Sequence, residues 1–420
     1  MAETSPHRAR IDAGRFRRDF DELASIGSTG DGGVHRPALG PAHLEAREWF
    51  RRRIVEDGLE LVVDGAGNHS ARLRCDDPVA RTLLLGSHLD SVPYGGRFDG
   101  ALGVVAALEA VRTVRDADLE LPLHLEAIDF TDEEGTWLPL LGSRALCGTL
   151  PRQEIETSLS QDEALRSALK RSGLTVEGLL QSAREPRTLA GFLELHIEQG
   201  PRLVASGARI GVVESIVGIR SLALVFHGRA DHAGTTRLGE RRDAGLGAAA
   251  LVLRAEEVVR AGFEECTINF GRAALRPGAL NIVPAQAELA LELRAPDDAR
   301  LDELESVLLE LARNCAEERG LQLAHSVVAS VPATACAHEC RAAFHAAAER
   351  LGLRTQQLIS GAGHDAMSMA AICPAGMIFV PSTGGSHSSR EHAEWGDCET
   401  GANTLLHALL TSAGVAADES

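Results

Sequence analysis

The stretch from residue 82 to residue 130 restricts the fold more than any other. In it, two apolar runs flank a turn and a segment whose apolar residues recur at helical spacing. Residues 82–87 form a short apolar run, a Pro/Gly-rich turn follows, and residues 101–115 carry apolar side chains at helical spacing. A second apolar run of strand length covers residues 122–130. Strand, loop, helix and strand in this order are typical of a βαβ unit in a largely parallel sheet. The sequence therefore predicts an α/β fold.

The length of the chain and a change of pattern near residue 211 indicate a second domain. A chain of 420 residues exceeds what one hydrophobic core usually supports. After residue 210 the pattern predicts strands of an exposed sheet at 211–226 and 280–294. It predicts helices at 241–261 and 297–319. We therefore expect a discontinuous first domain, 1–210 and 328–420, that carries an inserted α+β domain, 211–327.

Charge and composition argue against several classes of partner. The net charge is −18, and Lys170 is the only lysine. Nucleic acids and anionic membranes both require a cationic face, so neither is expected as a partner. No apolar run reaches the ~18–20 residues of a membrane helix, and residues 1–6 lack the apolar core of a signal peptide. With eight scattered cysteines, these features predict a cytoplasmic protein with reduced thiols.

The first segment with ligand chemistry follows the strand predicted at 82–87. Residues 86–93 read Gly-Ser-His-Leu-Asp-Ser-Val-Pro, and Asp99 lies at the end of the turn. Open α/β sheets place their chemistry just beyond the carboxyl ends of strands. Imidazole and carboxylate groups are ligands that Zn²⁺ or Mn²⁺ accepts. His88 and Asp99 are therefore candidate metal ligands.

The second segment is the pair Glu133-Glu134, which follows the apolar run at 122–130. Adjacent side chains at a strand end point in different directions. One glutamate can then bind a metal while the other acts as a general base. A solvated acidic loop is the commoner interpretation of an isolated Glu-Glu pair, and it remains the alternative.

The third segment places His196 inside an alternating apolar strand. The flanking Glu194, Glu198 and Gln199 indicate a polar face and could orient the imidazole through hydrogen bonds. The alternative is a histidine of the core.

Two more segments place histidines in loops of small residues. His232 lies in a Gly/Thr-rich loop of the predicted insert and could reach a substrate oxyanion, although a surface loop is as good an interpretation. His364, His387 and His392 lie near the C-terminus, and we expect at least one of them to be functional. In chain order, the five segments supply five ligands for two metal ions and one spare glutamate for water activation.

Taken in order, these segments resemble the co-catalytic zinc amidohydrolase and aminopeptidase superfamily over residues 12–412. Within it they are most similar to the branch of N-carbamoyl-L-amino-acid hydrolases, β-ureidopropionases and allantoate amidohydrolases. The two branch-specific stretches are His-Ile-Glu-Gln-Gly-Pro at 196–201 and His-Ala-Gly-Thr-Thr at 232–236.

The resemblance implies a mainly parallel-sheet domain that holds two divalent metal ions per subunit. Asp99 would bridge both ions, His88 and His196 would complete one site, and Glu134 and His387 would complete the other. Zn²⁺ is the expected metal, and Mn²⁺, Co²⁺ or Ni²⁺ suit the same ligands.

The resemblance also implies roles around the metals. Glu133 would be the general base for a metal-bridging water. His232 would stabilise the oxyanion in its own or in a partner subunit's site. Gln199, Asn281 and Arg294 would hold the substrate, and an arginine fork suits an α-carboxylate. The inserted α+β domain would serve as a lid and dimerisation domain, so a homodimer is expected.

The expected reaction is hydrolysis of a linear C–N amide bond in a small ureido substrate. An N-carbamoyl-L-amino acid would yield the amino acid, CO₂ and NH₃. Allantoate amidohydrolase activity is the nearest alternative, followed by a dipeptidase or another amide hydrolase of the same fold, and by a non-catalytic binding protein. The chain departs from the branch pattern at 136–140, Arg237 and Ser389. The first two departures border the substrate region, so the substrate and its enantiomer stay open.

Overall fold

The structure, a computed structural model, describes residues 8–415. Residues 1–6, on which the expectation about a signal peptide rests, lie outside this range. The chain divides into two compact units. Within the described range, the first comprises residues 8–214, 336–358 and 363–415, and the second comprises Ser215–Ala335 and Ile359–Ala362.

A mainly parallel sheet forms the centre of the first unit, with its strands in the order β1-β2-β4-β3-β5-β13-β6, and β11 (Thr334–Ala335) and β12 also pair with β6. Strand β3 pairs in parallel with β4 and β5, and β5 pairs in parallel with β13, whereas β1, β2 and β6 run antiparallel to their neighbours. The strands are β1 (Glu60–Val63), β2 (His69–Leu73), β3 (Thr82–His88), β4 (His124–Phe130), β5 (Leu189–Ile197), β6 (Ile210–Ile216), β12 (Thr355–Ser360) and β13 (Ala375–Val380).

Helix α3 (Ala101–Asp116) connects β3 to β4 and is buried over residues 101–114. Every residue of β3 and β4 is also buried, as expected for strands that are covered on both faces. The predicted βαβ unit is present, and the predicted α/β class is confirmed. The other helices of this unit are α1 (Ala13–Ser25), α2 (Pro41–Glu56), α4 (Leu141–Leu146), α5 (Arg152–Gln161), α6 (Glu163–Arg171), α7 (Val176–Gln181), α8 (Arg202–Ser206), α11 (His338–Arg350), α12 (Asp365–Met369) and α13 (Trp395–Ser412), with the 3₁₀ turn η2 (Pro186–Thr188).

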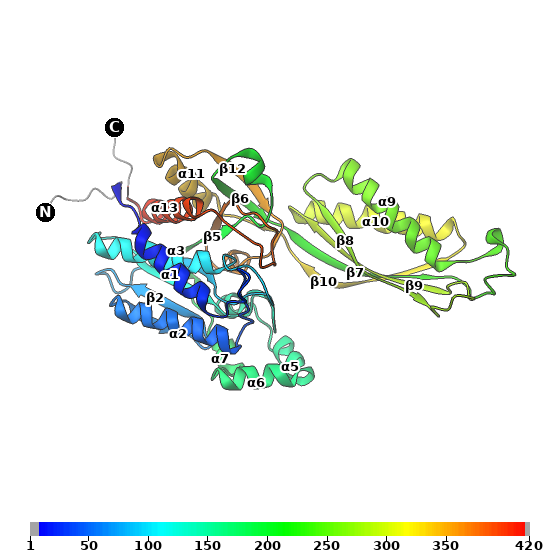
Figure 1. Ribbon diagram of the computed structural model, residues 1–420, viewed down its shortest axis with the longest axis horizontal. Helices are drawn as coiled ribbons and strands as arrows, with labels where there is room; N and C mark the ends of the chain where they lie inside the picture. The colour runs from blue at the N-terminus through cyan, green and yellow to red at the C-terminus, as the bar shows by residue number, and fades with distance from the viewer. Residues whose placement is uncertain (1–7, 416–420) are drawn as a thin grey trace. The chain divides into compact units, whose positions relative to one another are not determined.

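The second unit is built on a four-stranded antiparallel sheet in the order β10-β7-β9-β8. Helices α9 (Ala244–Gly262) and α10 (Asp298–Glu317) cover one face of it (Figure 1). Burial alternates strictly along β9 (Gln286–Ala295), so that every second side chain enters the core. The remaining elements are β7 (Gly218–His227), β8 (Thr267–Arg276), β10 (Gln322–Val331), β11 (Thr334–Ala335) and the 3₁₀ turn η3 (Leu238–Glu240).

Two strands of this sheet, β8 and β10, were not anticipated from the sequence. Their side chains are mostly exposed, so they carry little of the apolar alternation that identifies a half-buried strand. Strand β10 runs across residue 328, where the sequence suggested a domain boundary, and this compact unit continues to Ala335.

Two further findings bear on the environment of the protein. Within residues 8–415, none of the helices is long and apolar enough to cross a membrane. All eight cysteines are free thiols, and all but Cys75 are buried.

Candidate metal centre

Parallel strands of the first unit end at one edge of the sheet, and residues with ligand chemistry gather there. His88 is the last residue of β3, and His196 lies next to the end of β5. Glu133 and Glu134 follow the end of β4, and His387 follows the end of β13. Because the carboxyl ends of parallel strands share an edge, side chains far apart in the sequence meet at this point.

Asp99 lies at the centre of this group. Its Oδ1 is 3.1 Å from Nε2 of His196 and 3.7 Å from Nε2 of His88. Its other oxygen, Oδ2, is 3.7 Å from Nε2 of His387, which is also 3.6 Å from Oε2 of Glu134. The carboxylate thus presents one oxygen to each of two ligand groups, His88–Asp99–His196 and Asp99–Glu134–His387. This is the arrangement that a carboxylate bridging two metal ions requires.

The two buried histidines are oriented as metal ligands would be. Nδ1 of His88 lies 3.0 Å from the carbonyl oxygen of Asp90, and Nδ1 of His196 lies 3.0 Å from that of Ile197. A carbonyl can only accept, so each Nδ1 donates its proton to that carbonyl, and each Nε2 faces Asp99, where its lone pair would be available to a bound metal ion. Nε2 of His88 is buried and has no hydrogen-bond partner. A buried acceptor without a partner is rare, and a metal ion would satisfy it, so the residues fit the metal.

Gly100 allows the His88 ring to pack at this place. It precedes α3 with a φ of 63°, a conformation that residues with a side chain rarely adopt. A Cβ at this position would lie 2.4 Å from Cε1 of His88. The turn that carries Asp99 therefore requires glycine next to it.

Negative charge accumulates at Glu133 and Glu134. Burial, followed by the charge of Glu134, raises the pKa of Glu133 well above its usual value. Burial and the charge of Asp99 raise the pKa of Glu134 to about 9. Oε2 of Glu133 lies 3.5 Å from Nε2 of His88. A divalent cation would offset the mutual repulsion of these carboxylates.

Asp90 is a site residue to which the sequence analysis assigned no role. Its carboxylate accepts the main-chain N–H groups of Glu133 at 3.3 Å and of Glu134 at 3.2 Å. It thereby connects the end of β3 to the loop after β4. The available signal was an aspartate two residues beyond His88, in the segment already singled out, and the structure buries it completely.

Gln199, predicted to contact the substrate, lies beside Asp99. Its Nε2 donates to Oδ2 of Asp99 and to Oγ of Ser386, both over 2.9 Å. Its main-chain N–H donates to Oγ of Ser382 at 3.0 Å. The side chain thus connects Asp99 to the loop that carries His387.

The expectation that Glu194 and Glu198 orient the His196 ring by hydrogen bonds is wrong, because both carboxylates have other partners. Glu194 accepts from Oγ of Ser87 at 2.8 Å and from the main-chain N–H of Ala366 at 3.1 Å. Glu198 accepts the main-chain N–H groups of residues 202 and 203 at the start of α8. The carbonyl of Ile197 holds the imidazole instead.

The three C-terminal histidines have different surroundings. Only His387 joins the group around Asp99. The buried ring of His364 packs edge-on against His196, with 4.6 Å between centroids. His392 lies 3.3 Å from Glu394. Trp137, within the departure from the branch pattern at 136–140, donates its indole N–H to the carbonyl of Ala38 at 2.8 Å.

The second unit holds the other predicted site residues. His232 and Asn281 are both exposed and lie close together, since the main-chain N–H of Ala233 donates to the carbonyl of Asn281 at 2.9 Å. Arg294 lies near the end of β9, where it pairs with Glu292 at 2.9 Å and donates to the carbonyl of Gly361 at 2.5 Å. Asn281 precedes the start of the same ten-residue strand. The rise along β9 from Gln286 to Arg294 is about 26 Å, and Asn281 lies beyond the Gln286 end, so the structure does not bring Arg294 and Asn281 together in one chain.

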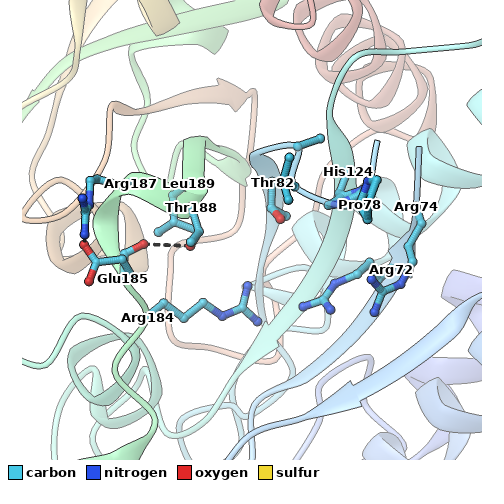
Figure 2. A pocket seen from close by; sticks show the side chains of 12 residues that line it. Arg72, Arg74, Pro78, Thr82, His124, Arg184, Glu185, Arg187, Thr188 and Leu189 are labelled. Atoms are coloured by element: carbon cyan, nitrogen blue, oxygen red, sulfur yellow. Dashed lines mark hydrogen bonds and ion pairs between the residues drawn. The ribbon is translucent and has the colours of Figure 1, made fainter. Parts of the chain in front are cut away.

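A cavity of the first unit, away from the group around Asp99, is lined by several arginines (Figure 2), but these arginines carry little unpaired charge. Its volume is about 590 Å³. Each arginine has a carboxylate partner: Arg72 and Arg184 share the buried Glu126, Arg74 pairs with Glu60, and Arg187 pairs with Glu185. The cavity is therefore the edge of an ion-pair network, and the centre around Asp99 remains the candidate functional site.

Comparisons with known proteins agree over nearly the whole chain. The model of Peptidase family M20/M25/M40 matches residues 84–411. The chain is 36% identical over 403 residues to an N-carbamoyl-L-amino acid amidohydrolase of Geobacillus stearothermophilus, covering 95% of this chain and 98% of the relative. It is 31% identical over 407 residues to an allantoate deiminase of Arabidopsis thaliana, covering 88% and 77%. A crystal structure of a hydantoinase/carbamoylase family amidase from Burkholderia ambifaria has a TM-score of 0.87 and 36% identity, covering 97% of this chain and 99% of that chain.

Proposed function

Because this chain belongs to Peptidase family M20/M25/M40, we propose that it is a metal-dependent amidohydrolase of carbon–nitrogen bonds other than peptide bonds. Its substrates are N-carbamoyl-L-amino acids, which it converts to the amino acid, CO₂ and NH₃. The similarity to an N-carbamoyl-L-amino acid amidohydrolase supports the substrate class. The observation that carries the chemistry is the position of Asp99, with one carboxylate oxygen facing each of two ligand groups.

We assign two divalent ions to this centre. His88, Asp99 and His196 would hold one, and Asp99, Glu134 and His387 would hold the other. When bound, the pair of ions supplies a polarised water of lowered pKa and positive charge for the oxyanion. Imidazole and carboxylate ligands suit Zn²⁺ first, with Mn²⁺, Co²⁺ or Ni²⁺ as alternatives.

Glu133 is proposed as the general base. Its carboxylate lies within 3.5 Å of His88 but belongs to neither of the two ligand groups that share Asp99. Burial and neighbouring negative charge favour its protonated form in the absence of metal, so it can hold a proton taken from the attacking water. It then returns this proton to the leaving nitrogen.

The substrate contacts are proposed from chemistry. Gln199 offers an amide next to Asp99, and the planar fork of Arg294 can bind both oxygens of an α-carboxylate. His232 would stabilise the oxyanion, and Asn281 would add a further polar contact. The separation of Asn281 and Arg294 along one chain suits a homodimer in which two subunits contribute to each site. Eight free thiols suit a reducing, cytoplasmic environment.

A substrate panel combined with one variant tests this proposal. The wild-type enzyme, reconstituted with Zn²⁺ or Mn²⁺, is assayed with N-carbamoyl-L-amino acids, N-carbamoyl-β-alanine and allantoate. We expect the highest kcat/KM for an N-carbamoyl-L-amino acid. Glu133→Gln should keep two metals per chain and lose about 10²–10⁴-fold in kcat. Glu120→Gln, at an exposed position, is the control. Near-normal turnover of Glu133→Gln with both metals bound would show that another group is the base.

Allantoate hydrolysis is the second candidate function, favoured by the similarity to an allantoate deiminase. It would use the same ligands and the same base on a substrate with two ureido groups. A higher kcat/KM for allantoate in the panel would replace the substrate assignment and leave the metal chemistry in place. Metal binding without turnover of any substrate in the panel would favour a binding protein.

A further inference from the structure

We propose that Glu391 is a positioning residue that fixes the turn bearing Asp99 against the loop bearing His387. This inference rests on the proposed metal-dependent function, because it concerns the placement of two of the proposed ligands. Glu391 belongs to neither of the ligand groups that contain Asp99. It was part of the last segment singled out in the sequence, where no role was assigned to it.

The first contact of Glu391 is with the main chain of Asp99. Its Oε1 accepts the N–H of Asp99 at 3.3 Å. Only 4% of the Glu391 residue is exposed, so water does not compete strongly for this carboxylate. Glu391 therefore holds the backbone of Asp99, while Gln199 holds its side chain.

The second contact is with Gly96 in the same turn. A Cβ added to Gly96 would lie 2.0 Å from Oε1 of Glu391 and 2.3 Å from its Cδ. The carboxylate thus occupies the space that any side chain at position 96 would need. The turn folds around the Glu391 carboxylate, and glycine at this position makes the close approach possible.

The other end of the connection is the loop that carries His387. The main-chain groups of Thr383 and His392 exchange two hydrogen bonds, of 2.8 and 2.9 Å, and these close the loop. Glu391 lies next to this closure, and its own N–H donates to the carbonyl of Ser388 at 3.0 Å. His387 lies between the two closing residues, with a φ of 53°. The backbone of Glu391 is therefore fixed to the His387 loop, while its side chain is fixed to the Asp99 turn.

This connection matters because Asp99 and His387 come from segments far apart in the sequence. Both contribute to the same proposed metal position, where Nε2 of His387 lies 3.7 Å from Oδ2 of Asp99. Removal of a group that hydrogen-bonds to a metal ligand and orients it commonly lowers metal affinity about 10–100-fold. Loss of the Glu391 carboxylate should let the turn and the loop move independently and weaken this position.

The experiment compares Glu391→Ala, Glu391→Gln and the control Glu394→Gln, whose side chain is 81% exposed. Zn²⁺ binding is measured by equilibrium dialysis, the absorption spectrum is recorded after loading with Co²⁺, and kcat and KM are determined. We expect Glu391→Ala to bind one of two ions about 10–100-fold more weakly, with an altered Co²⁺ spectrum and a lower kcat. Glu391→Gln keeps an oxygen acceptor and should recover most of the affinity. Glu394→Gln should match the wild type.

The outcomes separate this inference from the function on which it rests. If wild-type protein does not bind two ions, the proposed function fails. If it does, and Glu391→Ala binds both ions with wild-type affinity and spectrum, the positioning role is overturned. Equal losses of metal affinity in the Ala and Gln variants would also overturn it. Glutamine keeps an oxygen that can accept the Asp99 N–H, so the lost affinity would not come from the loss of this hydrogen bond. Should Glu391→Ala not fold, Gly96→Ala disturbs the same contact from the opposite side, and unchanged metal affinity in that variant would overturn the role.

Discussion

The side-chain amide of Gln199 donates a 2.9 Å hydrogen bond to Oδ2 of Asp99. That oxygen is the one that faces His387. A residue proposed to bind substrate is thus in direct contact with the carboxylate proposed to bridge the metals. Gln199 has a positive φ of 58°, so its backbone is held in a conformation that non-glycine residues rarely adopt. Such a conformation is consistent with a functional position.

Replacement of Gln199 tests its role in substrate binding. Gln199→Ala should lower kcat/KM about 10–100-fold, as expected for a lost hydrogen bond of about 1.5–3 kcal/mol to a charged group. Because Gln199 belongs to neither proposed ligand group, two metals per chain should still bind at saturating metal. Steady-state kinetics and elemental analysis check both points. Gln161→Ala, at an exposed position, is the control. An unchanged kcat/KM would exclude Gln199 from substrate binding.

Asp99→Asn should remove both metals, whereas His196→Ala should remove only one. The difference arises because Asp99 offers one oxygen to each ligand group, and His196 belongs to only one of the two groups that contain Asp99. Elemental analysis after gel filtration gives the number of ions per chain. Asp76→Asn, at an exposed position, should retain two. One ion retained by Asp99→Asn would mean that Asp99 is not the bridge.

The metal-free protein should lose stability as the pH rises from 6.5 to 9. Burial, with the charge of Asp99, raises the pKa of Glu134 to about 9. Burial opposes a charge on His196, but its hydrogen bond and charge interaction with Asp99 raise the pKa of His196 to about 9. A group with a higher pKa in the folded state stabilises it at low pH and loses this contribution as the pH rises through that pKa.

The opposite shift of His88 does not cancel this effect. Burial lowers the pKa of His88 to about 4, so its contribution changes below 6.5, outside this range. Each proton involved contributes a slope of up to about 1.4 kcal/mol per pH unit. Denaturant titrations of chelator-treated protein measure the slope, which should be smaller for Glu134→Gln and for metal-loaded protein. Stability of metal-free protein that rises from pH 6.5 to 9 would contradict the prediction.

Arg47→Met should destabilise the fold by about 3–5 kcal/mol, because it leaves a buried carboxylate without its partner. Nε of Arg47 lies 2.9 Å from Oδ2 of Asp129, and the two side chains are 4% and 0% exposed. Arg51→Met on the same helix is the control, since that side chain is 49% exposed. Denaturant unfolding measures both variants. Metal affinity should also fall for Arg47→Met, since Asp129 accepts the main-chain N–H of Leu89 beside His88 at 2.8 Å.

Arg294→Ala should discriminate between substrates. For an N-carbamoyl-L-amino acid we expect kcat/KM to fall by about 10–100-fold, since a charge-assisted hydrogen bond to the α-carboxylate is lost. Hydrolysis of the matching N-carbamoyl amine, which has no carboxylate, should hardly change. Arg260→Ala, whose side chain is 77% exposed, is the control. Equal losses with both substrates would exclude a carboxylate clamp.

Much of the fold could be predicted because its signals are local. The continuous apolar run before His88 and the helical spacing of apolar residues after Asp99 are both visible in short segments, so β3, α3 and β4 could be identified. Strands β8 and β10 could not, since their side chains mostly face solvent and show neither an apolar run nor a clear alternation. The ring orientation of His196 was also beyond prediction, because the carbonyl that holds it belongs to a backbone whose path is set by the whole sheet.

The sequence by itself determined which residue types are available for chemistry. It also determined that these residues follow strands of an α/β fold, because both properties depend on short segments of the chain. Only the tertiary structure decided which atoms meet. The strand order β4-β3-β5-β13 brings four separate segments to one edge, where Asp99 presents Oδ1 to His88 and His196 and Oδ2 to His387. It also placed Glu391 beneath the Asp99 turn. Of these contacts only the one with His88 is local, since Asp99 lies 97 positions from His196 and 292 positions from Glu391, and no local pattern encodes such pairings.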